Sequence, residues 1–516
     1  MKKILLFLLC GAALLAALGA CKPKTQADPL TIKTEAGFVH GFMDEDIYAF
    51  AGIPYCQAER FMPPQKPDAW EGVLECTKYP PRAMQTITPP DPDPLGLSED
   101  GATRLNVWTP DPKGKLPVMV WLHGGGFSSG AGYNNPNDSG RGLARQDVVV
   151  VSVNHRLNIL GFLDLSACGE KYKYSGNVGM MDIVTALEWV RDNIAAFGGD
   201  PSNVTIFGES GGGGKVGTLM CMPSAKGLFH KAAILSGTLL NTNTAEASRA
   251  LGLKTLEKLG LTPAETDKLA DIPYETLVKA GNEANAELRG VRRPGTANFW
   301  GFGPTIDGEI LLMQPFQPSF SELSKDVPLM IGSTFNELQK TYYIEQPTEK
   351  EARAILKQTY GKQADAYVKA FKKAYPEFDT PADWLSVDQM FRPNTVRTAD
   401  ARADENVAPV YVYLFAWKSP IQGGKMGAAH AYELPFVFHT TEVSQQYLGD
   451  ETDEIRALAD KMSAAWVSFA KTGKPSVDGF DWQAYKSKGG DIMYFGPECS
   501  VRKDYDRELV TIMQNR

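Results

Sequence analysis

The sequence predicts an α/β protein built on a large, mostly parallel central sheet with helices on both faces. Two observations predict this fold class. Apolar runs such as residues 116–123 and 147–154 are too continuous for half-exposed strands and fit buried ones. Residues 177–197 between them and the next strand have the periodicity of a helix. Alternation of strand and helix indicates βαβ units, in which neighbouring strands pair in parallel.

The remaining segments fit this plan in chain order. Residues 30–55 form short alternating stretches broken by glycines, which predicts an antiparallel hairpin at the sheet edge. Residues 244–290 and 348–406 are helical in pattern, and the second segment is expected to form a helical cap insertion over the site. Further strands are predicted at residues 204–209, 232–236, 327–332 and 408–417, and a long amphipathic helix at residues 451–472.

The first residues resemble a processing signal. Lys2 and Lys3 precede an apolar run that is short for a membrane span. The run ends in Leu18-Gly19-Ala20-Cys21, which resembles the bacterial lipobox and predicts lipidation of Cys21. We therefore expect a signal peptide at residues 1–20, a polar tether at 21–29 and a single domain at 30–516, exported and anchored to a bacterial membrane. The alternative is an ordinary secretory signal with an incidental cysteine.

The net charge argues against one class of partner, and the cysteine spacing argues against two kinds of site. The formal charge of −8 leaves no excess of basic residues to neutralise phosphates, so nucleic acid is not expected as a partner. Beyond Cys10 and Cys21 the chain has cysteines at 56, 76, 168, 221 and 499, with no C-x-x-C spacing for a metal knuckle or a redox pair. In an exported protein Cys56 and Cys76 could form a disulfide, a question that the sequence leaves open.

The chemistry is expected to centre on Ser210. Residues 204–212 are a β-branched run that ends in Gly208-Glu209-Ser210-Gly211-Gly212. A strand that stops at G-x-S-x-G and leads into a helix is the nucleophile elbow of the α/β-hydrolase fold, with Ser210 as the nucleophile. Upstream, the run His123-Gly124-Gly125-Gly126-Phe127 follows a predicted strand and matches the glycine loop that supplies oxyanion donors in that fold.

A serine nucleophile needs a histidine base and a carboxylate that orients it. In this fold the chain order is serine, acid, histidine. Of the histidines after Ser210, His430 lies in a small-residue loop behind a late strand and is favoured over His439. The acid is expected in the loop after residues 327–332, where Glu337 lies, with Asp307 as its rival.

These residues and the blocks around them resemble the type-B carboxylesterase family, which includes acetylcholinesterases, para-nitrobenzyl esterases and the non-enzymatic neuroligins. The resemblance runs from about residue 30 to the C-terminus and implies Ser210 as nucleophile, Glu337 as acid and His430 as base. The blocks that carry it are residues 50–55, 60–61, 105–110, 121–127, 154–163, 197–212, 236–237, 332–337, 427–438 and 469–473.

The resemblance also implies an oxyanion hole made by the backbone N–H groups of Gly125, Gly126 and Gly211, with Ser236 as a serine close to the triad. Gly211 departs from the family, which usually has alanine there. We therefore expect a serine esterase that needs no metal or organic cofactor and acts on small-molecule esters. A catalytically silent, neuroligin-like binding protein and a peptidase on the same fold are the alternatives.

Overall fold

The computed structural model describes residues 28–86, 95–133, 139–290, 301–317, 319–338, 341–404 and 407–516. An eleven-stranded sheet runs through them in the order β16-β15-β14-β13-β10-β9-β7-β8-β6-β4-β3. Its strands are β3 (Phe42–Asp44), β4 (Ile47–Pro54), β6 (Arg104–Thr109), β7 (Leu116–Leu122), β8 (Val149–Val153), β9 (Gly199–Glu209), β10 (Lys231–Leu235), β13 (Leu329–Thr334), β14 (Val410–Phe415), β15 (Asp491–Phe495) and β16 (Ser500–Lys503).

The middle of this sheet is parallel, as predicted. The strands from β8 through β7, β9, β10, β13 and β14 to β15 pair in parallel, whereas β3, β4, β6 and β16 pair antiparallel at the two edges. The hairpin expected in residues 30–55 is present as β3 and β4. The pairs of β1 (Thr31–Lys33) with β2 (Phe38–His40), and of β2 with β5 (Val73–Glu75), form a small separate sheet.

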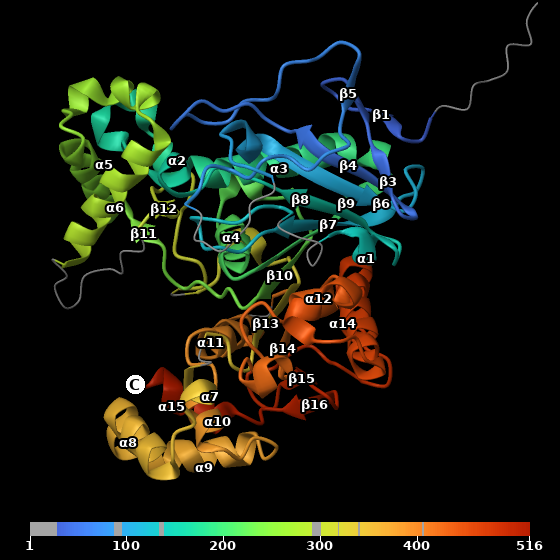
Figure 1. Cartoon of the computed structure of the whole chain (residues 1–516), viewed down its shortest axis with the longest axis vertical. Coiled ribbons are helices and arrows are strands. Elements are labelled where there is room, and N and C mark those ends of the chain that lie inside the picture. Colours follow the sequence, from blue (N-terminus) through green and yellow to red (C-terminus); the bar gives the residue numbers. More distant parts are fainter. Residues whose placement is uncertain are drawn as a thin grey trace, which may run out of the picture.

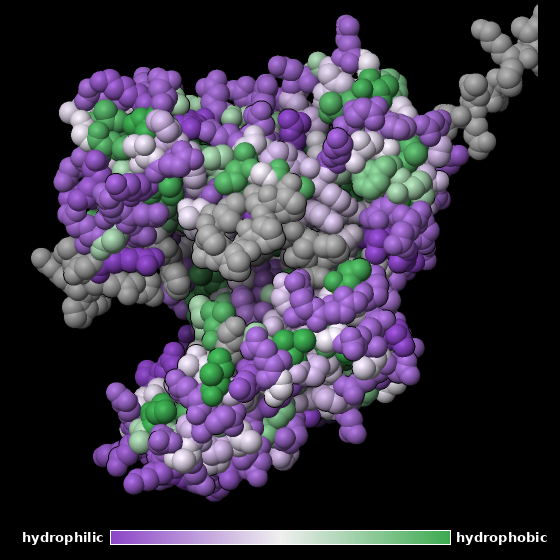
Figure 2. Space-filling view, in the orientation of Figure 1, coloured by the Kyte–Doolittle hydropathy of each residue, from purple (hydrophilic) through white to green (hydrophobic). Residues whose placement is uncertain are grey.

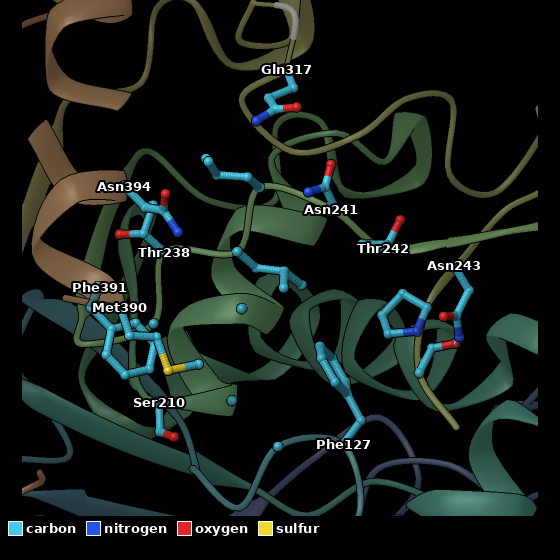
Figure 3. A pocket seen from close by; sticks show the side chains of 18 of the residues that line it. Phe127, Ser210, Thr238, Asn241, Thr242, Asn243, Gln317, Met390, Phe391 and Asn394 are labelled. Atoms are coloured by element: carbon cyan, nitrogen blue, oxygen red, sulfur yellow. Dashed lines mark hydrogen bonds between the residues drawn. The ribbon is translucent and has the colours of Figure 1, made fainter. Parts of the chain in front are cut away.

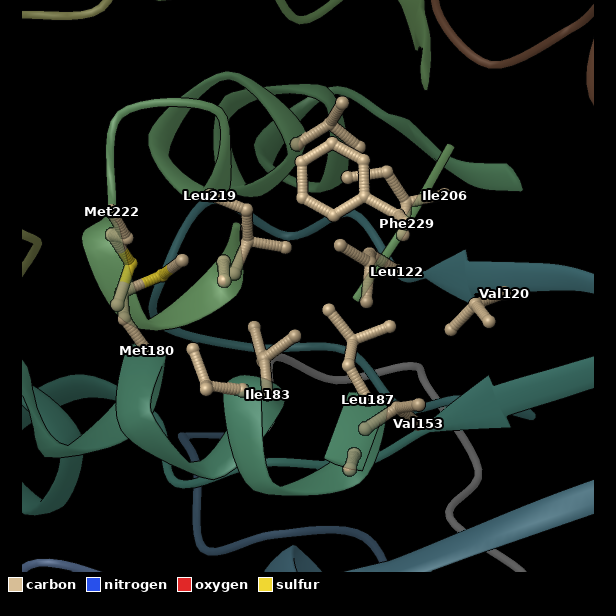
Figure 4. Packing of buried hydrophobic residues seen from close by; sticks show 14 of the residues in the cluster. Val120, Leu122, Val153, Met180, Ile183, Leu187, Ile206, Leu219, Met222 and Phe229 are labelled. Atoms are coloured by element: carbon tan, nitrogen blue, oxygen red, sulfur yellow. The ribbon is translucent and has the colours of Figure 1, made fainter. Parts of the chain in front are cut away.

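Two hydrophobic cores cover the two faces of the sheet. On β7, Val118, Val120 and Leu122 belong to one core, and the alternate residues Met119 and Trp121 belong to the other. Figure 4 shows the first core, where strand residues pack against α3 (Val178–Asn193) and α4 (Gly211–Leu219). The long helix predicted at residues 451–472 is α14 (Asp453–Thr472), which packs in the second core. Helices thus lie on both faces of the sheet, as the α/β-hydrolase fold requires.

The other helices gather mainly into two groups (Figure 1). One contains α5 (Ala245–Lys258) and α6 (Tyr274–Gly290). The other contains α7 (Thr341–Glu345), α8 (Glu349–Tyr360), α9 (Ala364–Ala374), α10 (Pro381–Ser386) and α11 (Phe391–Asp404). The remaining α-helices are α1 (Arg141–Ala144), α2 (Asn158–Phe162), α12 (Leu434–Val437), α13 (Gln445–Leu448) and α15 (Arg507–Gln514). The molecular surface is hollowed between the two groups (Figure 2).

The segment expected to form a cap has two roles in the structure. Helices α8 and α9 bury Leu356, Tyr367 and Phe371 in the second core, so they mainly support the sheet. Among the described residues of this segment, Met390 and the first half of α11, with Phe391, Asn394 and Arg397, line a cavity. The sequence pattern also missed β6, β15 and β16, of which β6 and β16 are edge or near-edge strands with antiparallel partners.

Candidate active site

Ser210 lies at the turn between β9 and α4. Its backbone has φ 55° and ψ −123°, a conformation that residues with a side chain rarely adopt. Its N–H donates to the carbonyl of Leu235, at 2.9 Å, which ties the turn to the neighbouring strand. A Cβ on Gly208 would lie 2.5 Å from the carbonyl carbon of Gly212, so glycine is required where the two segments meet. The turn has the geometry of a nucleophile elbow.

The glycine loop after β7 lies against this elbow. Gly125 and Gly126 have φ values of 84° and 64°, in the left-handed region that suits glycine. Among the residues that the structure describes, no acceptor takes up the N–H of Gly125, Gly126 or Gly211. A Cβ on Gly211 would lie only 2.2 Å from the carbonyl oxygen of Gly126. The loop therefore approaches the elbow more closely than an alanine at position 211 would allow, and three N–H donors are grouped beside Ser210.

Glu337 and His430 lie in the loops that follow β13 and β14, and their side chains contact each other. The carboxylate oxygen Oε2 of Glu337 is hydrogen-bonded to Nδ1 of His430. The second carboxylate oxygen accepts the N–H of Thr334 at 2.7 Å, and Glu337 is buried. The other imidazole nitrogen, Nε2, lies 3.2 Å from Oε1 of Glu209, the residue directly before Ser210. Glu337 therefore holds the imidazole with Nε2 turned toward the elbow.

Asn336 joins the two loops that carry the acid and the base. Its side-chain oxygen accepts the N–H of Ala428 at 2.7 Å, while its own N–H donates to the Ala428 carbonyl at 3.0 Å. One residue further along, the N–H of His430 donates to the Glu337 carbonyl at 3.1 Å. A buried amide with its donors and acceptor satisfied fixes the relative position of both loops. The sequence gives no sign of this role, because the partner of Asn336 lies 92 residues along the chain.

Two further carboxylates, Glu209 and Glu433, are buried beside His430. Burial, together with the nearby Glu337 charge, raises the pKa of Glu209 to about 7, although His430 opposes the shift. Burial, together with the charges of Glu209 and Glu337, raises the pKa of Glu433 well above its usual value. For His430, burial lowers the pKa, but the charges of Glu209 and Glu337 outweigh it and raise the pKa to about 10. The cluster therefore strongly favours the protonated imidazole.

Ser236 follows β10 directly and lies in the same cluster. It is fully buried, and its hydroxyl donates to Oε1 of Glu433 at 3.1 Å. Its N–H donates to the carbonyl of Gly332 at 2.9 Å. Ser236 therefore orients a carboxyl group near the base and connects it to the central strands.

Lys215 is a buried cation on α4, five positions after Ser210. Its ammonium group donates to the carbonyl of His123 at 2.7 Å, at the start of the glycine loop. Burial lowers the pKa of Lys215 to about 7. His123 and His155 stack nearby with ring centroids 5.1 Å apart, and burial lowers the pKa of both imidazoles well below the usual value. These histidines are neutral packing groups. Lys215 supports the glycine loop through its hydrogen bond to the His123 carbonyl.

The rival acid and base lie elsewhere. The Asp307 carboxylate accepts the N–H groups of residues 309–311 and the side chain of Asn177, so it caps a turn next to β12 (Thr305–Ile306). His439 bonds Asp460 at 2.8 Å in an exposed pair. The third downstream histidine, His230, bonds the backbone N–H of Val204 at 3.1 Å.

A cavity of about 490 Å³ opens beside Ser210. Its wall includes Gly126 and Gly211 from the proposed oxyanion hole, and Phe127 from the glycine loop. Phe391 also lines it, and its ring stacks on the His430 imidazole with centroids 5.5 Å apart. Ser210 thus lies at one end of the cavity, beside Phe391, which stacks on the predicted base (Figure 3).

Other expectations fall outside this site. Cys56 and Cys76 are buried free thiols, so the disulfide left open by the sequence is not formed. Cys21 and the signal region lie outside the described residues. Within the described ranges, no helix is both long enough and apolar enough to cross a membrane, and no group of His, Cys, Asp or Glu side chains has the arrangement of a metal site.

Comparison with known proteins identifies the family of the chain. The model of the carboxylesterase family matches residues 28–512. The para-nitrobenzyl esterase of Bacillus subtilis is 35% identical over 493 residues, covering 92% of this chain and 97% of its own length. The fumonisin B1 esterase of Sphingopyxis macrogoltabida is 30% identical, with 91% of this chain and 87% of its own length covered.

Solved structures agree along nearly the whole chain. An esterase from Clostridium hathewayi that can hydrolyse aliphatic aromatic polyesters superposes with a TM-score of 0.85 at 36% identity, covering 94% of this chain and 98% of that one. A carboxylesterase of Geobacillus stearothermophilus superposes with a TM-score of 0.75 at 36% identity, covering 93% and 99%.

Proposed function

Because the chain belongs to the carboxylesterase family and is a carboxylic ester hydrolase, we propose that it acts through an acyl-enzyme formed on Ser210. In this proposal His430 is the base and Glu337 is the acid that orients it. The observation that carries the proposal is the Glu337–His430 pair, with Nε2 turned toward the strained elbow, where three backbone N–H groups have no acceptor among the described residues.

The proposed reaction has two halves. Oγ of Ser210 attacks the ester carbonyl carbon while its proton passes to Nε2 of His430. The N–H groups of Gly125, Gly126 and Gly211 stabilise the negative oxygen of the tetrahedral intermediate. The intermediate collapses, the C–O bond to the alcohol breaks, and His430 returns the proton to the leaving alkoxide. A water molecule then attacks the acyl carbon and gives its proton to His430. The bond between the acyl carbon and Oγ of Ser210 breaks, His430 returns the proton to Oγ, and the carboxylic acid is released.

The residues around the triad support these roles. The Glu337 carboxylate stabilises the imidazolium that forms in each half of the reaction. The N-terminus of α4 begins at Gly211 and adds its dipole to the oxyanion donors. Because the cluster raises the pKa of His430, we expect kcat/KM to rise with pH as the imidazole loses its proton.

Turnover assays distinguish this proposal from its alternatives. We expect hydrolysis of short-chain 4-nitrophenyl esters, and a loss of about 10⁴-fold or more in kcat in the Ser210→Ala variant. Matched anilides should react far more slowly than the esters; equal rates would favour a peptidase. A folded wild-type protein without ester turnover would instead favour a binding protein of the neuroligin kind.

The cellular location is a separate proposal. We propose that Cys21 is lipidated and anchors the domain to a bacterial membrane, on the basis of the lipobox-like residues 18–21. Expression of Cys21→Ser in a bacterium should move the protein from the membrane fraction to the soluble fraction. An unchanged distribution would contradict the anchor without affecting the esterase proposal.

A further inference from the structure

The cavity changes character along its length. Near Ser210 its wall is apolar, with Met390 and Phe391 beside the nucleophile, and Phe127 lines the cavity farther across (Figure 3). Farther from Ser210, the amide side chains of Asn394, Asn241 and Gln317 line the same space. These residues come from segments far apart in the sequence, so the folded chain, and not a local motif, creates the polar end. We call the group Asn241, Gln317, Asn394 and Arg397 the distal cluster.

The distal cluster differs from the other polar residues of the wall in its hydrogen bonds. Thr238 bonds Thr395 at 3.1 Å, and the side-chain N–H of Asn243 donates to the Gly301 carbonyl at 2.8 Å. The hydroxyl of Thr242 donates to Gln314 at 3.1 Å. By contrast, no described residue forms a hydrogen bond or ion pair with any side chain of the distal cluster. These four side chains are therefore available to a bound molecule.

Arg397 stands out among the charged residues of α11. Arg392 forms a buried ion pair with Asp506, and Asp400 pairs with Arg507. Arg402 donates to the Val327 carbonyl at 2.8 Å. Within the part of the chain that the structure describes, Arg397 is exposed, has no ion-pair partner, and is the one charged residue that lines the cavity. Its charge can therefore pair with a ligand without breaking a contact of the protein.

Helix α11 runs from the reacting end of the cavity toward Arg397. Phe391, which stacks on His430, and Asn394 and Arg397 recur every three residues, so they share one broad face of the helix. Six residues of helix separate the backbone of Phe391 from that of Arg397, a rise of about 9 Å. A substrate that reaches Ser210 with its ester group can thus extend past Asn394 to the guanidinium.

We propose that the distal cluster binds a carboxylate at the far end of the substrate, so that the preferred esters carry a free carboxylate remote from the reacting group. The inference rests on the proposed function of Ser210 and adds a substrate class to it. A guanidinium fork and amide N–H groups match the oxygens of a carboxylate in number and geometry. Half-esters of dicarboxylic acids and esters of long hydroxy acids belong to this class.

The exposure of Arg397 determines how large a preference for charged esters we expect. An ion pair at an exposed position is screened by solvent, and Arg397 is exposed. We therefore expect a gain of about fivefold in kcat/KM over the matched neutral ester at low ionic strength. Salt should reduce the gain, because the attraction between exposed charges is screened over a Debye length of about 10 Å at 0.1 M ionic strength.

The test compares charged and neutral esters of equal length. The first series uses mono-4-nitrophenyl esters of C4 to C10 dicarboxylic acids. Its neutral controls carry a methyl ester in place of the free carboxylate. The second series uses butyrate esters of ω-hydroxy acids, with the methyl esters of the same acids as neutral controls. In at least one series we expect the charged ester to be preferred at an intermediate length. Arg397→Gln should abolish the preference and Arg397→Lys should keep part of it. Arg353→Gln, on α8 and outside the cavity lining, should leave it intact.

Neutral 4-nitrophenyl butyrate separates this inference from the proposed function. All three variants should hydrolyse it at the wild-type rate. If butyrate turnover is normal and neither series shows a preference that depends on Arg397, the carboxylate site is wrong and the esterase proposal stands. If wild-type protein does not hydrolyse butyrate, the proposed function fails, and this inference fails with it.

Discussion

The two ends of the cavity are built in opposite ways. At the end that contains Ser210, the acid and its neighbours are held by other parts of the protein: Glu337 by Thr334 and His430, and Ser236 by Glu433. At the other end, the side chains of Asn394 and Arg397 have no partner among the described residues. The difference suggests a division of labour, in which one end is fixed for chemistry common to all substrates and the other selects among them.

Glu337→Gln should have the largest effect on the fixed end. An amide can contact the imidazole but cannot stabilise its charged form, so kcat should fall by about 10³- to 10⁴-fold for charged and neutral esters alike. Steady-state kinetics on both substrate types measures this. Asp307→Asn, which changes the rival acid, should leave kcat within about twofold. A large loss in Asp307→Asn and a small one in Glu337→Gln would reverse the assignment of the acid.

Gly211→Ala should disturb the fixed end by moving the glycine loop. The added Cβ would lie 2.2 Å from the Gly126 oxygen, so the loop must retreat from the elbow. Loss or displacement of one oxyanion donor typically costs about 10²-fold in kcat, and we expect a fall of that order with KM little changed. An unchanged kcat would show that the donors keep their positions after the loop moves.

Glu209→Gln should shift the pH dependence of the reaction. The Glu209 charge helps to raise the pKa of His430, and its removal should lower that pKa. Since His430 acts as a base in its neutral form, the acid limb of the kcat/KM profile should move to lower pH, by about one unit. The profile of Glu442→Gln, which changes an exposed glutamate away from the cavity, is the control. A shift to higher pH would contradict the proposed electrostatics.

Lys215→Met should have the smallest effect on chemistry and a measurable one on stability. Burial lowers the pKa of Lys215 to about 7 from an unfolded value near 10.4, so the unfolded state binds more protons between these pH values. The cost of the buried charge is therefore complete at and below pH 7 and disappears toward pH 10. Loss of the bond to the His123 carbonyl offsets part of the gain.

Thermal unfolding at several pH values tests this effect on stability. Relative to wild type, the Tm of Lys215→Met should rise by about 2–4 °C at pH 6, and the difference should shrink as the pH increases. Lys226→Met, which changes an exposed lysine just beyond the same helix, should show no such pH dependence. A gain that grows with pH would mean that the lysine is not buried as a costly charge.

The same contrast explains what the sequence could predict. The elbow and the glycine loop are local: a strand, a turn and a few glycines specify them, and the structure has them at Ser210 and Gly125 as expected. The parallel strands were also predictable, because buried strands give continuous apolar runs. Glu337 and His430 could be proposed from chain order and family resemblance, although they are 93 residues apart.

What the sequence could not predict depends on long-range packing. Glu433 affects the chemistry only because folding brings it to Ser236, 197 residues away. Lys215 resembles an ordinary helix lysine until the structure shows it buried under the glycine loop. The distal cluster combines Asn241 and Gln317 with two residues of α11, and no local pattern links them. The charged residues of α11 could be interpreted only when the structure showed their partners, such as Asp506 for Arg392 and Arg507 for Asp400.

The most direct test of the division of labour is covalent labelling of the fixed end. Wild-type protein incubated with a fluorophosphonate should gain the mass of one label per chain, and peptide mapping should place it on Ser210. Ser210→Ala should take up none, and Arg397→Gln should be labelled at the wild-type rate, because the probe has no carboxylate for the distal end. A label on another residue, or none on folded wild-type protein, would contradict the account.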